Sequence, residues 1–178
     1  DRRASDGRRP ELCIIGEPSG WDRITLAYKG SAWLEYTVRR PLAHTAGQSA
    51  SACDAAVGFW NAVQARVGAF NVGRSRAFDQ LTASLRAMHS AQDGFAETAW
   101  LTVNLRLPPD LTVSEAVDLL SAEVGDGELR LLDGLECYRA NKNSPLVRAF
   151  LPAIRAQGGQ PAFVVKTGTS DMNIVGPA

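Results

Sequence analysis

The sequence predicts an α/β protein in which a ferredoxin-like βαββαβ unit interrupts a parallel α/β layer. Two short, continuously apolar runs, Leu12–Ile15 and Ala162–Val165, lie near the two ends of the 178-residue chain. Such runs are typical of strands buried on both faces of a parallel sheet. Between them the apolar residues follow strand and helix periods in turn. We therefore expect two partial segments of the layer, at residues 1–30 and 140–178, around an inserted unit at residues 31–139.

The composition disfavours two classes of partner. The chain carries 19 basic and 19 acidic residues, whereas nucleic-acid binding normally requires a basic excess. We interpret the arginines near the start as a solvated loop rather than a phosphate-binding patch. No apolar run approaches the ~20 residues that a membrane helix needs, and no apolar core of a signal peptide follows Asp1–Asp6. These features predict a cytoplasmic protein with neither a nucleic-acid nor a membrane partner.

The three cysteines, Cys13, Cys53 and Cys137, lie far apart and within apolar patterns. The sequence contains no CxxC pair, which excludes a zinc ribbon. We therefore expect buried, reduced thiols, as in a cytoplasmic protein.

Two strand patterns and a helical one come next, the first within the segment at residues 1–30 and the other two within the inserted unit. Residues 23–29 and 33–39 alternate apolar and polar side chains, as half-buried strands do, and Gly30 separates the two runs. Pro41 ends the second run. A helix is expected at about residues 48–68, where apolar side chains recur at helical spacing.

A hairpin follows, because two alternating runs, 81–90 and 96–107, flank the tight-turn dipeptide Asp93-Gly94. One face of the second strand carries only apolar side chains, and the other face carries Trp100, Thr102, Asn104 and Arg106.

The inserted unit is completed by a helix and a strand. Thr112 and Glu115 form a capping box that starts a helix ending near Gly125, and residues 128–138 are expected to form a strand. The order strand, helix, strand, strand, helix, strand is that of the ferredoxin-like fold, with both helices on one face of the sheet. The other face and an edge strand stay open for a partner subunit.

The last segment again has the pattern of a parallel α/β layer. Ser144-Pro145 combines a cap with a first-turn proline, and Gly158-Gly159 ends the helix that follows. Residues 161–166 are expected to form a short buried strand that leads into the turn Gly168–Asp171.

Few side chains are suited to acid–base or metal chemistry. His44 follows a predicted strand, where it is either a surface loop histidine or a group for proton transfer or charge stabilisation; His89 lies within a strand pattern and is interpreted as structural or solvent-facing. Glu17 directly follows an apolar run and is either a turn residue or a metal ligand. Two histidines and no HExxH motif argue against a self-contained zinc site. A triad of Ser170, His44 and Asp171 is disfavoured because no nucleophile elbow is present.

Two further groups are candidates for substrate binding. Arg106, beside Asn104 on the polar face of its strand, either grips a substrate carboxylate through two parallel hydrogen bonds or is solvated or paired. Gly168, Thr169 and Ser170 offer backbone amides and hydroxyls after a strand, either as a nest for an anion or as a plain helix cap.

Taken in order, three motifs resemble the zinc-dependent aminoacylase family, which includes acetylornithine deacetylase, succinyl-diaminopimelate desuccinylase and carboxypeptidase G-type enzymes. They are the runs Ile15–Gly30, Pro41–Gly47 and Lys166–Asn173. The first and last are most similar to the branch that deacylates lysine or ornithine precursors, including those attached to an amino-group carrier protein.

This resemblance implies a fragment built around the lid of such an enzyme, in which a catalytic domain is interrupted by a ferredoxin-like lid that forms a homodimer. It assigns Glu17 to zinc binding. It assigns His44 to the partner subunit's active site, where the imidazole hydrogen-bonds the oxyanion. The implied substrate-binding residues are Arg106, Asn104, Gly168, Thr169 and Ser170.

The implied reaction is metal-assisted hydrolysis of an amide, which releases the acyl group from an amino acid such as acetylornithine or acetyl-lysine. Zinc is the implied cofactor, and the implied substrate is a small acyl-amino acid or a carrier-linked one. The family's other metal ligands and its glutamate base are absent from these 178 residues. We therefore expect that this chain alone neither holds zinc tightly nor catalyses hydrolysis.

Two other interpretations remain open at this point. The unit at residues 31–139 could serve as a non-catalytic dimerisation or small-molecule-binding module, or as a sensor domain, because ferredoxin-like folds host many functions. The neighbouring coding sequence separates these from an enzyme. A histidine–aspartate pair and a glutamate pair upstream, with a histidine downstream, favour the enzyme.

Overall fold

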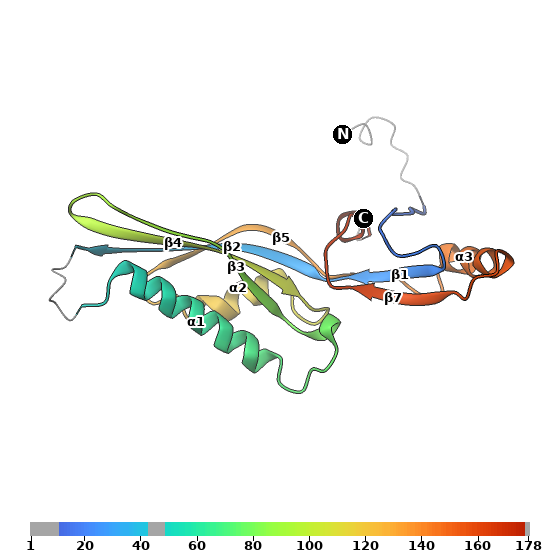
Figure 1. Cartoon of the computed structure of the whole chain (residues 1–178), viewed down its shortest axis with the longest axis horizontal. Coiled ribbons are helices and arrows are strands. Elements are labelled where there is room, and N and C mark those ends of the chain that lie inside the picture. Colours follow the sequence, from blue (N-terminus) through green and yellow to red (C-terminus); the bar gives the residue numbers. More distant parts are fainter. Residues whose placement is uncertain (1–10, 43–48, 177–178) are drawn as a thin grey trace, which may run out of the picture.

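The chain folds into two β-sheets that lie end to end along the long axis of the molecule (Figure 1). The computed structural model describes residues 11–42 and 49–176. The strand order of the three-stranded sheet is β6-β1-β7, and that of the four-stranded sheet is β3-β4-β2-β5. The mixed α/β class predicted from the sequence is confirmed.

The four-stranded sheet has the ferredoxin-like strand order that the sequence predicts. Each neighbouring pair in it is antiparallel, with the helices inserted after the first and third of its strands. Its elements are β2 (Gly30–Pro41), α1 (Ala52–Phe70), β3 (Thr82–Gln92), β4 (Ala96–Leu107), α2 (Val113–Ser121) and β5 (Glu128–Leu135), and the 3-10 helix η2 (Ala77–Asp79) precedes β3.

The core lies between this sheet and its two helices, which cover the same face (Figure 1). Both helices begin with a capping box, from Ser51 and Asp54 in α1 and from Thr112 and Glu115 in α2. The predicted apolar face of β4 is completely buried, at Ala99, Leu101, Val103, Leu105 and Leu107. Because side chains alternate along a strand, the polar residues between them must emerge on the face that the helices leave open.

The three-stranded sheet provides a short parallel layer. β1 (Arg23–Tyr28) pairs in parallel with β7 and antiparallel with β6, so the carboxyl ends of β1 and β7 lie at the same edge. The other elements of this part are β6 (Tyr138–Arg139), α3 (Pro145–Ala156), β7 (Ala162–Lys166) and α4 (Met172–Val175). Among the helices of the described residues, none has the length and apolar character needed to cross a bilayer.

The prediction of a strand at Leu12–Ile15 is wrong. This segment has no strand assignment, and the side chains of Leu12 and Ile14 are 49% and 66% exposed. The strand order β6-β1-β7 does not include this segment, so its apolar side chains are not enclosed as those of a central parallel strand would be. The prediction that Cys13 is buried is wrong for the same reason, since its thiol is exposed.

Three smaller differences have simple causes. The strand expected at residues 128–138 is divided into β5 and β6, because the chain passes from one sheet to the other at Glu136 and Cys137. Phe163 of β7 is 46% exposed, so this strand is not buried on both faces. Cys53 and Cys137 are half-buried rather than fully buried. The division of the chain at residues 30 and 140 stays a prediction.

The hairpin between β3 and β4 turns at Asp93 and Gly94, as the sequence predicts. Gly94 has a φ of +89°, which favours glycine. Oδ1 of Asp93 accepts hydrogen bonds from the backbone N–H groups of Phe95 (3.0 Å) and Ala96 (2.8 Å). These amides, followed by the Arg39 guanidinium at 2.8 Å, lower the pKa of Asp93 from 3.8 to about 2.

This shift predicts a loss of stability in acid. The folded-state pKa of Asp93 lies below its unfolded value, so the carboxylate stabilises the fold above about pH 4, and this contribution disappears as the pH falls towards 2. We expect Asp93→Asn to have a shallower decline of unfolding free energy across this range, as measured by urea unfolding at a series of pH values. Asp118→Asn, at an exposed position of α2, is the control. Identical pH profiles for Asp93→Asn and the wild type would contradict the prediction.

Candidate functional site

The candidate site lies at the carboxyl ends of β1 and β7, where ligands of parallel α/β sheets bind. The segment before β1 crosses this layer and is tied to it by two hydrogen bonds. Lys166 Nζ donates to the carbonyl of Pro18 at 3.0 Å, and the hydroxyls of Ser19 and Thr25 lie 2.6 Å apart. These contacts place the predicted metal ligand, Glu17, beside the end of β1.

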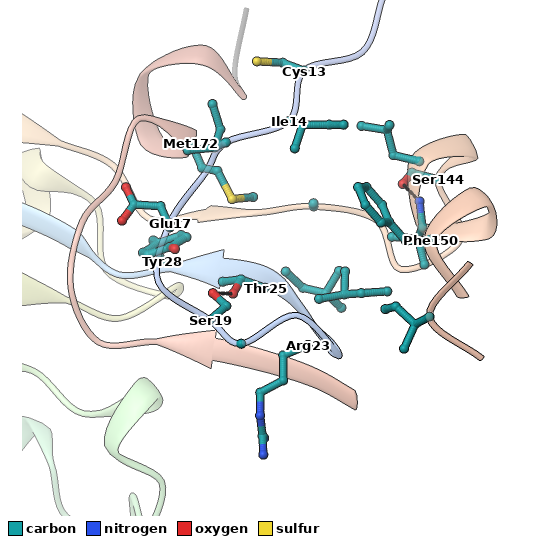
Figure 2. Close-up of a pocket in the computed structure, with 18 of the residues that line it drawn as sticks. Cys13, Ile14, Glu17, Ser19, Arg23, Thr25, Tyr28, Ser144, Phe150 and Met172 are labelled. Atoms are coloured by element: carbon teal, nitrogen blue, oxygen red, sulfur yellow. Dashed lines mark hydrogen bonds between the residues drawn. The ribbon is translucent and has the colours of Figure 1, made fainter. Parts of the chain in front are cut away.

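Glu17 is half-buried and lines a cavity of about 310 Å³. Figure 2 shows Glu17, Tyr28 and Met172 at one end of this cavity and Phe150 of α3 at the other. Burial raises the pKa of Tyr28, and the negative charge of Glu17 raises it further, while nearby hydroxyls, including that of Ser170, oppose the shift. The structure therefore brings Glu17, Tyr28 and Ser170 together, although they are far apart in the sequence.

The turn after β7 is held by its own side chains. Ser170 Oγ accepts a hydrogen bond from the backbone N–H of Met172 at 3.0 Å, and the backbone N–H of Ser170 donates to Oδ1 of Asn173 at 2.9 Å. Both partners lie in the short helix α4, so the turn is also the start of a helix.

Arg106 joins the two sheets at this turn. It lies on the open face of β4, and its Nη1 donates to Thr169 Oγ1 at 3.1 Å. Two of the predicted substrate-binding elements, 63 residues apart in the sequence, are thus in direct contact. The guanidinium retains further N–H groups that a ligand can engage.

Asn104, unlike Arg106, hydrogen-bonds within its own sheet. Its side chain is buried, and its Nδ2 donates to Ser31 Oγ at 2.9 Å and to the carbonyl of Ala32 at 3.3 Å. Both partners belong to β2, so the Asn104 amide group connects two strands within the sheet.

Of the two histidines, one lies within the described residues and one lies outside them. His44, the predicted catalytic residue, lies outside the described residues. His89 is exposed on β3 and stacks on Trp100, with ring centroids 4.7 Å apart and planes 9° apart. This position agrees with a structural or solvent-facing histidine.

The described residues do not form a metal centre by themselves. They contain no group of three or more histidine, cysteine, aspartate or glutamate side chains that could hold a metal ion. Glu17 can offer one carboxylate, and a zinc site requires at least three protein ligands. The described part of the chain therefore does not fit a complete zinc site.

Sequence reasoning missed two buried polar residues, Lys29 and Asn173. Their side chains hydrogen-bond to backbone carbonyl groups of distant segments. Both residues belong to the runs that carry the family resemblance, but local spacing gives no signal of which distant carbonyl a side chain reaches.

Known proteins are similar in sequence to this chain over nearly its whole length. No family model matches the chain. It is 39% identical over 180 residues to the [LysW]-lysine hydrolase of Deinococcus radiodurans, in a match that covers 98% of this chain and 49% of that protein. It is 31% identical over 172 residues to a putative [LysW]-lysine/[LysW]-ornithine hydrolase of Thermococcus kodakarensis, with 97% and 44% covered.

Solved structures share the fold. An amidase of the hydantoinase/carbamoylase family from Burkholderia vietnamiensis superimposes with a TM-score of 0.59 at 17% identity, over 82% of this chain and 37% of that one. Human carnosine dipeptidase 1 gives a TM-score of 0.59 at 13% identity, over 87% and 48%. The fold is therefore that of a segment of amidases and dipeptidases.

The predicted resemblance is confirmed, because the sequence matches a segment of the [LysW]-lysine and [LysW]-ornithine hydrolases and a fragment of this family accounts for both comparisons. The chain spans about half the length of the curated relatives it matches.

The position of Glu17 can be tested through the ionisation of Tyr28. Replacing the carboxylate in Glu17→Gln removes a negative charge that, after burial, raises the pKa of Tyr28, so this pKa should fall. An ultraviolet absorbance titration of tyrosinate, assigned by comparison with Tyr28→Phe, measures this change. Glu11→Gln, on the exposed part of the same segment, should leave the titration unchanged. An equal effect of both substitutions would contradict the arrangement.

Proposed function

We propose that this chain supplies the lid and part of the catalytic layer of a hydrolase that releases lysine or ornithine from an amide linkage to an amino-group carrier protein. The observation that carries this proposal is the match to the [LysW]-lysine hydrolase of Deinococcus radiodurans, at 39% identity over 98% of this chain. The carrier protein LysW, named in several relatives, is the proposed source of the substrate.

The contact between Arg106 and Thr169 supports the proposed binding of the substrate. An amino-acid product carries a free carboxylate, which a guanidinium can bind through charge-assisted hydrogen bonds. Thr169 orients Arg106 from the opposite sheet. Gly168 and Ser170 flank Thr169 on the same turn, and Ser170 holds this turn through its backbone N–H bond to Asn173 Oδ1. We assign Arg106 to carboxylate binding and Gly168–Ser170 to the substrate-binding turn.

A second subunit has a role in this proposal. We assign His44 to the oxyanion of the partner's substrate, where one hydrogen-bond donor is worth roughly 3–4 kcal/mol of transition-state stabilisation. The outer half of β3, from Ala87 to Gln92, is exposed at the edge of its sheet. An edge strand of this kind offers unpaired backbone groups to another chain, which supports a homodimer through the lid.

Zinc stays a proposal. The carboxylate of Glu17 is assigned as one ligand, and the remaining ligands would have to come from outside the described residues. When bound in such a hydrolase, the metal polarises the scissile carbonyl. The residues of this chain have the separate task of binding and orienting the substrate around it.

This division of tasks predicts the behaviour of the isolated chain. The purified 178-residue protein should neither retain stoichiometric zinc after dialysis nor hydrolyse acetylornithine or acetyl-lysine, because its described residues supply only one of the proposed ligands. Metal analysis and a ninhydrin assay of released amine check both points. The protein encoded by the complete reading frame is the positive control. Clear turnover by the isolated chain would contradict the proposal.

Arg106 should matter for the carboxylate of the substrate. In the protein encoded by the complete reading frame, we expect Arg106→Ala to raise KM roughly 10- to 150-fold, which corresponds to the ~1.5–3 kcal/mol of a hydrogen bond to a charged group. A substrate analogue with a carboxamide in place of the carboxylate should lose much less. Arg130→Ala removes an exposed arginine of the same sheet that pairs with Glu35 and is the matched control. Equal losses for both substrates would refute the assignment.

A further inference from the structure

The chain crosses between the two sheets at two places, and the two crossings lie against each other. β1 passes into β2 at Lys29-Gly30, and β5 passes into β6 at Glu136-Cys137; we call these four residues the joint. A Cβ atom on Gly30 would lie 2.6 Å from the carbonyl oxygen of Leu135 and 2.8 Å from the backbone nitrogen of Cys137. Both neighbours are backbone atoms, so no side chain fits at position 30 without separating the crossings.

Asn173 connects both crossings through a single amide group. Its side chain is 4% exposed, and its Nδ2 donates to the carbonyl oxygens of Lys29 at 3.1 Å and Glu136 at 2.7 Å. Its Oδ1 accepts from the backbone N–H of Ser170 at 2.9 Å. Three segments that are distant in sequence therefore meet at one side chain, and one of them is the turn that carries Thr169.

The side chain of Lys29 ties the joint to the four-stranded sheet. It is 1% exposed, and its Nζ donates to the carbonyl oxygens of Ala77 (3.3 Å) and Gln80, which lie in η2 and directly after it. Burial lowers the pKa of Lys29. These bonds fix the loop that precedes β3, so the sheet that carries Arg106 is held to the joint from a second side.

We propose that Asn173 is a positioning residue that sets the angle between the two sheets and thereby keeps Arg106 within reach of Thr169. A carboxamide is suited to this position because it provides two N–H donors and one acceptor in a rigid plane. Buried polar groups that are fully satisfied hold one arrangement, and an unpaired one is costly. The proposal rests on the proposed function only where Arg106 and Thr169 are taken as substrate-binding groups.

The Asn173→Asp substitution separates the two parts of this arrangement. An aspartate keeps an oxygen for the Ser170 amide and loses both donors to Lys29 and Glu136. The matched control is Asn71→Asp, since the Asn71 amide makes a similar pair of bonds to the backbone of Leu81, at 2.7 and 2.8 Å, within the inserted unit only. Both variants should lower the unfolding midpoint, because each leaves a buried carbonyl unpaired.

Three measurements on the full chain distinguish positioning from stability. In nuclear magnetic resonance, the side-chain Nε–H signal of Arg106, assigned with Arg106→Lys, should shift in Asn173→Asp to the position that it takes in Thr169→Val. Amide exchange at the joint should become roughly tenfold faster, and small-angle scattering should show a wider distribution of intersheet distances. Asn71→Asp should leave all three unchanged.

The proposal is overturned if Asn173→Asp lowers the unfolding midpoint but keeps the Arg106 signal and the scattering profile of the wild type. If Asn173→Asp does not fold, the same measurements are made on Asn173→Ala, which introduces no charge. The same results would support or overturn the proposal. None of these measurements uses a substrate. A failure of Arg106→Ala to raise KM would therefore refute the proposed function while leaving this inference intact.

Discussion

The arrangement of the molecule depends on the close approach of two backbone segments where the chain passes between its sheets. Gly30 contacts residues 135–137 so closely that only a hydrogen atom fits on its Cα. The buried amide of Asn173 then binds a carbonyl from each crossing. Because Asn173 also accepts a hydrogen bond from the backbone of Ser170, the joint is connected to the turn whose Thr169 contacts Arg106 of β4.

The four-stranded sheet reaches the candidate site through the face that its helices leave uncovered. Helices α1 and α2 cover one face of the four-stranded sheet, and every apolar residue of that face on β4 from Ala99 to Leu107 is buried. Strand alternation then requires Arg106 to emerge on the opposite face. The alternation of apolar and polar residues along β4 thus gives one face to the buried core and places the Arg106 guanidinium on the other face.

Polar side chains gather at the candidate site, but the described residues do not include a cluster of metal ligands. Arg106, Thr169, Tyr28 and Glu17 surround the carboxyl ends of β1 and β7, whereas the described residues hold no cluster of metal-ligating side chains. The chain also spans about half the length of its curated relatives. Under the proposed function, this segment would bind the substrate, and most of the metal ligands would come from outside the described residues.

The sequence by itself determined the elements whose signals are local. Apolar periodicity, the capping box at Thr112 and the Asp93-Gly94 turn each involve residues that are close together in the sequence, and they sufficed for the ferredoxin-like order and for the polar face of β4. The tertiary structure alone decided the exposure of Leu12–Ile15, the contact of Arg106 with Thr169 and the bridging by Asn173. Those depend on partners many residues away, and a local pattern records that a side chain is polar or apolar but not which distant group it will meet.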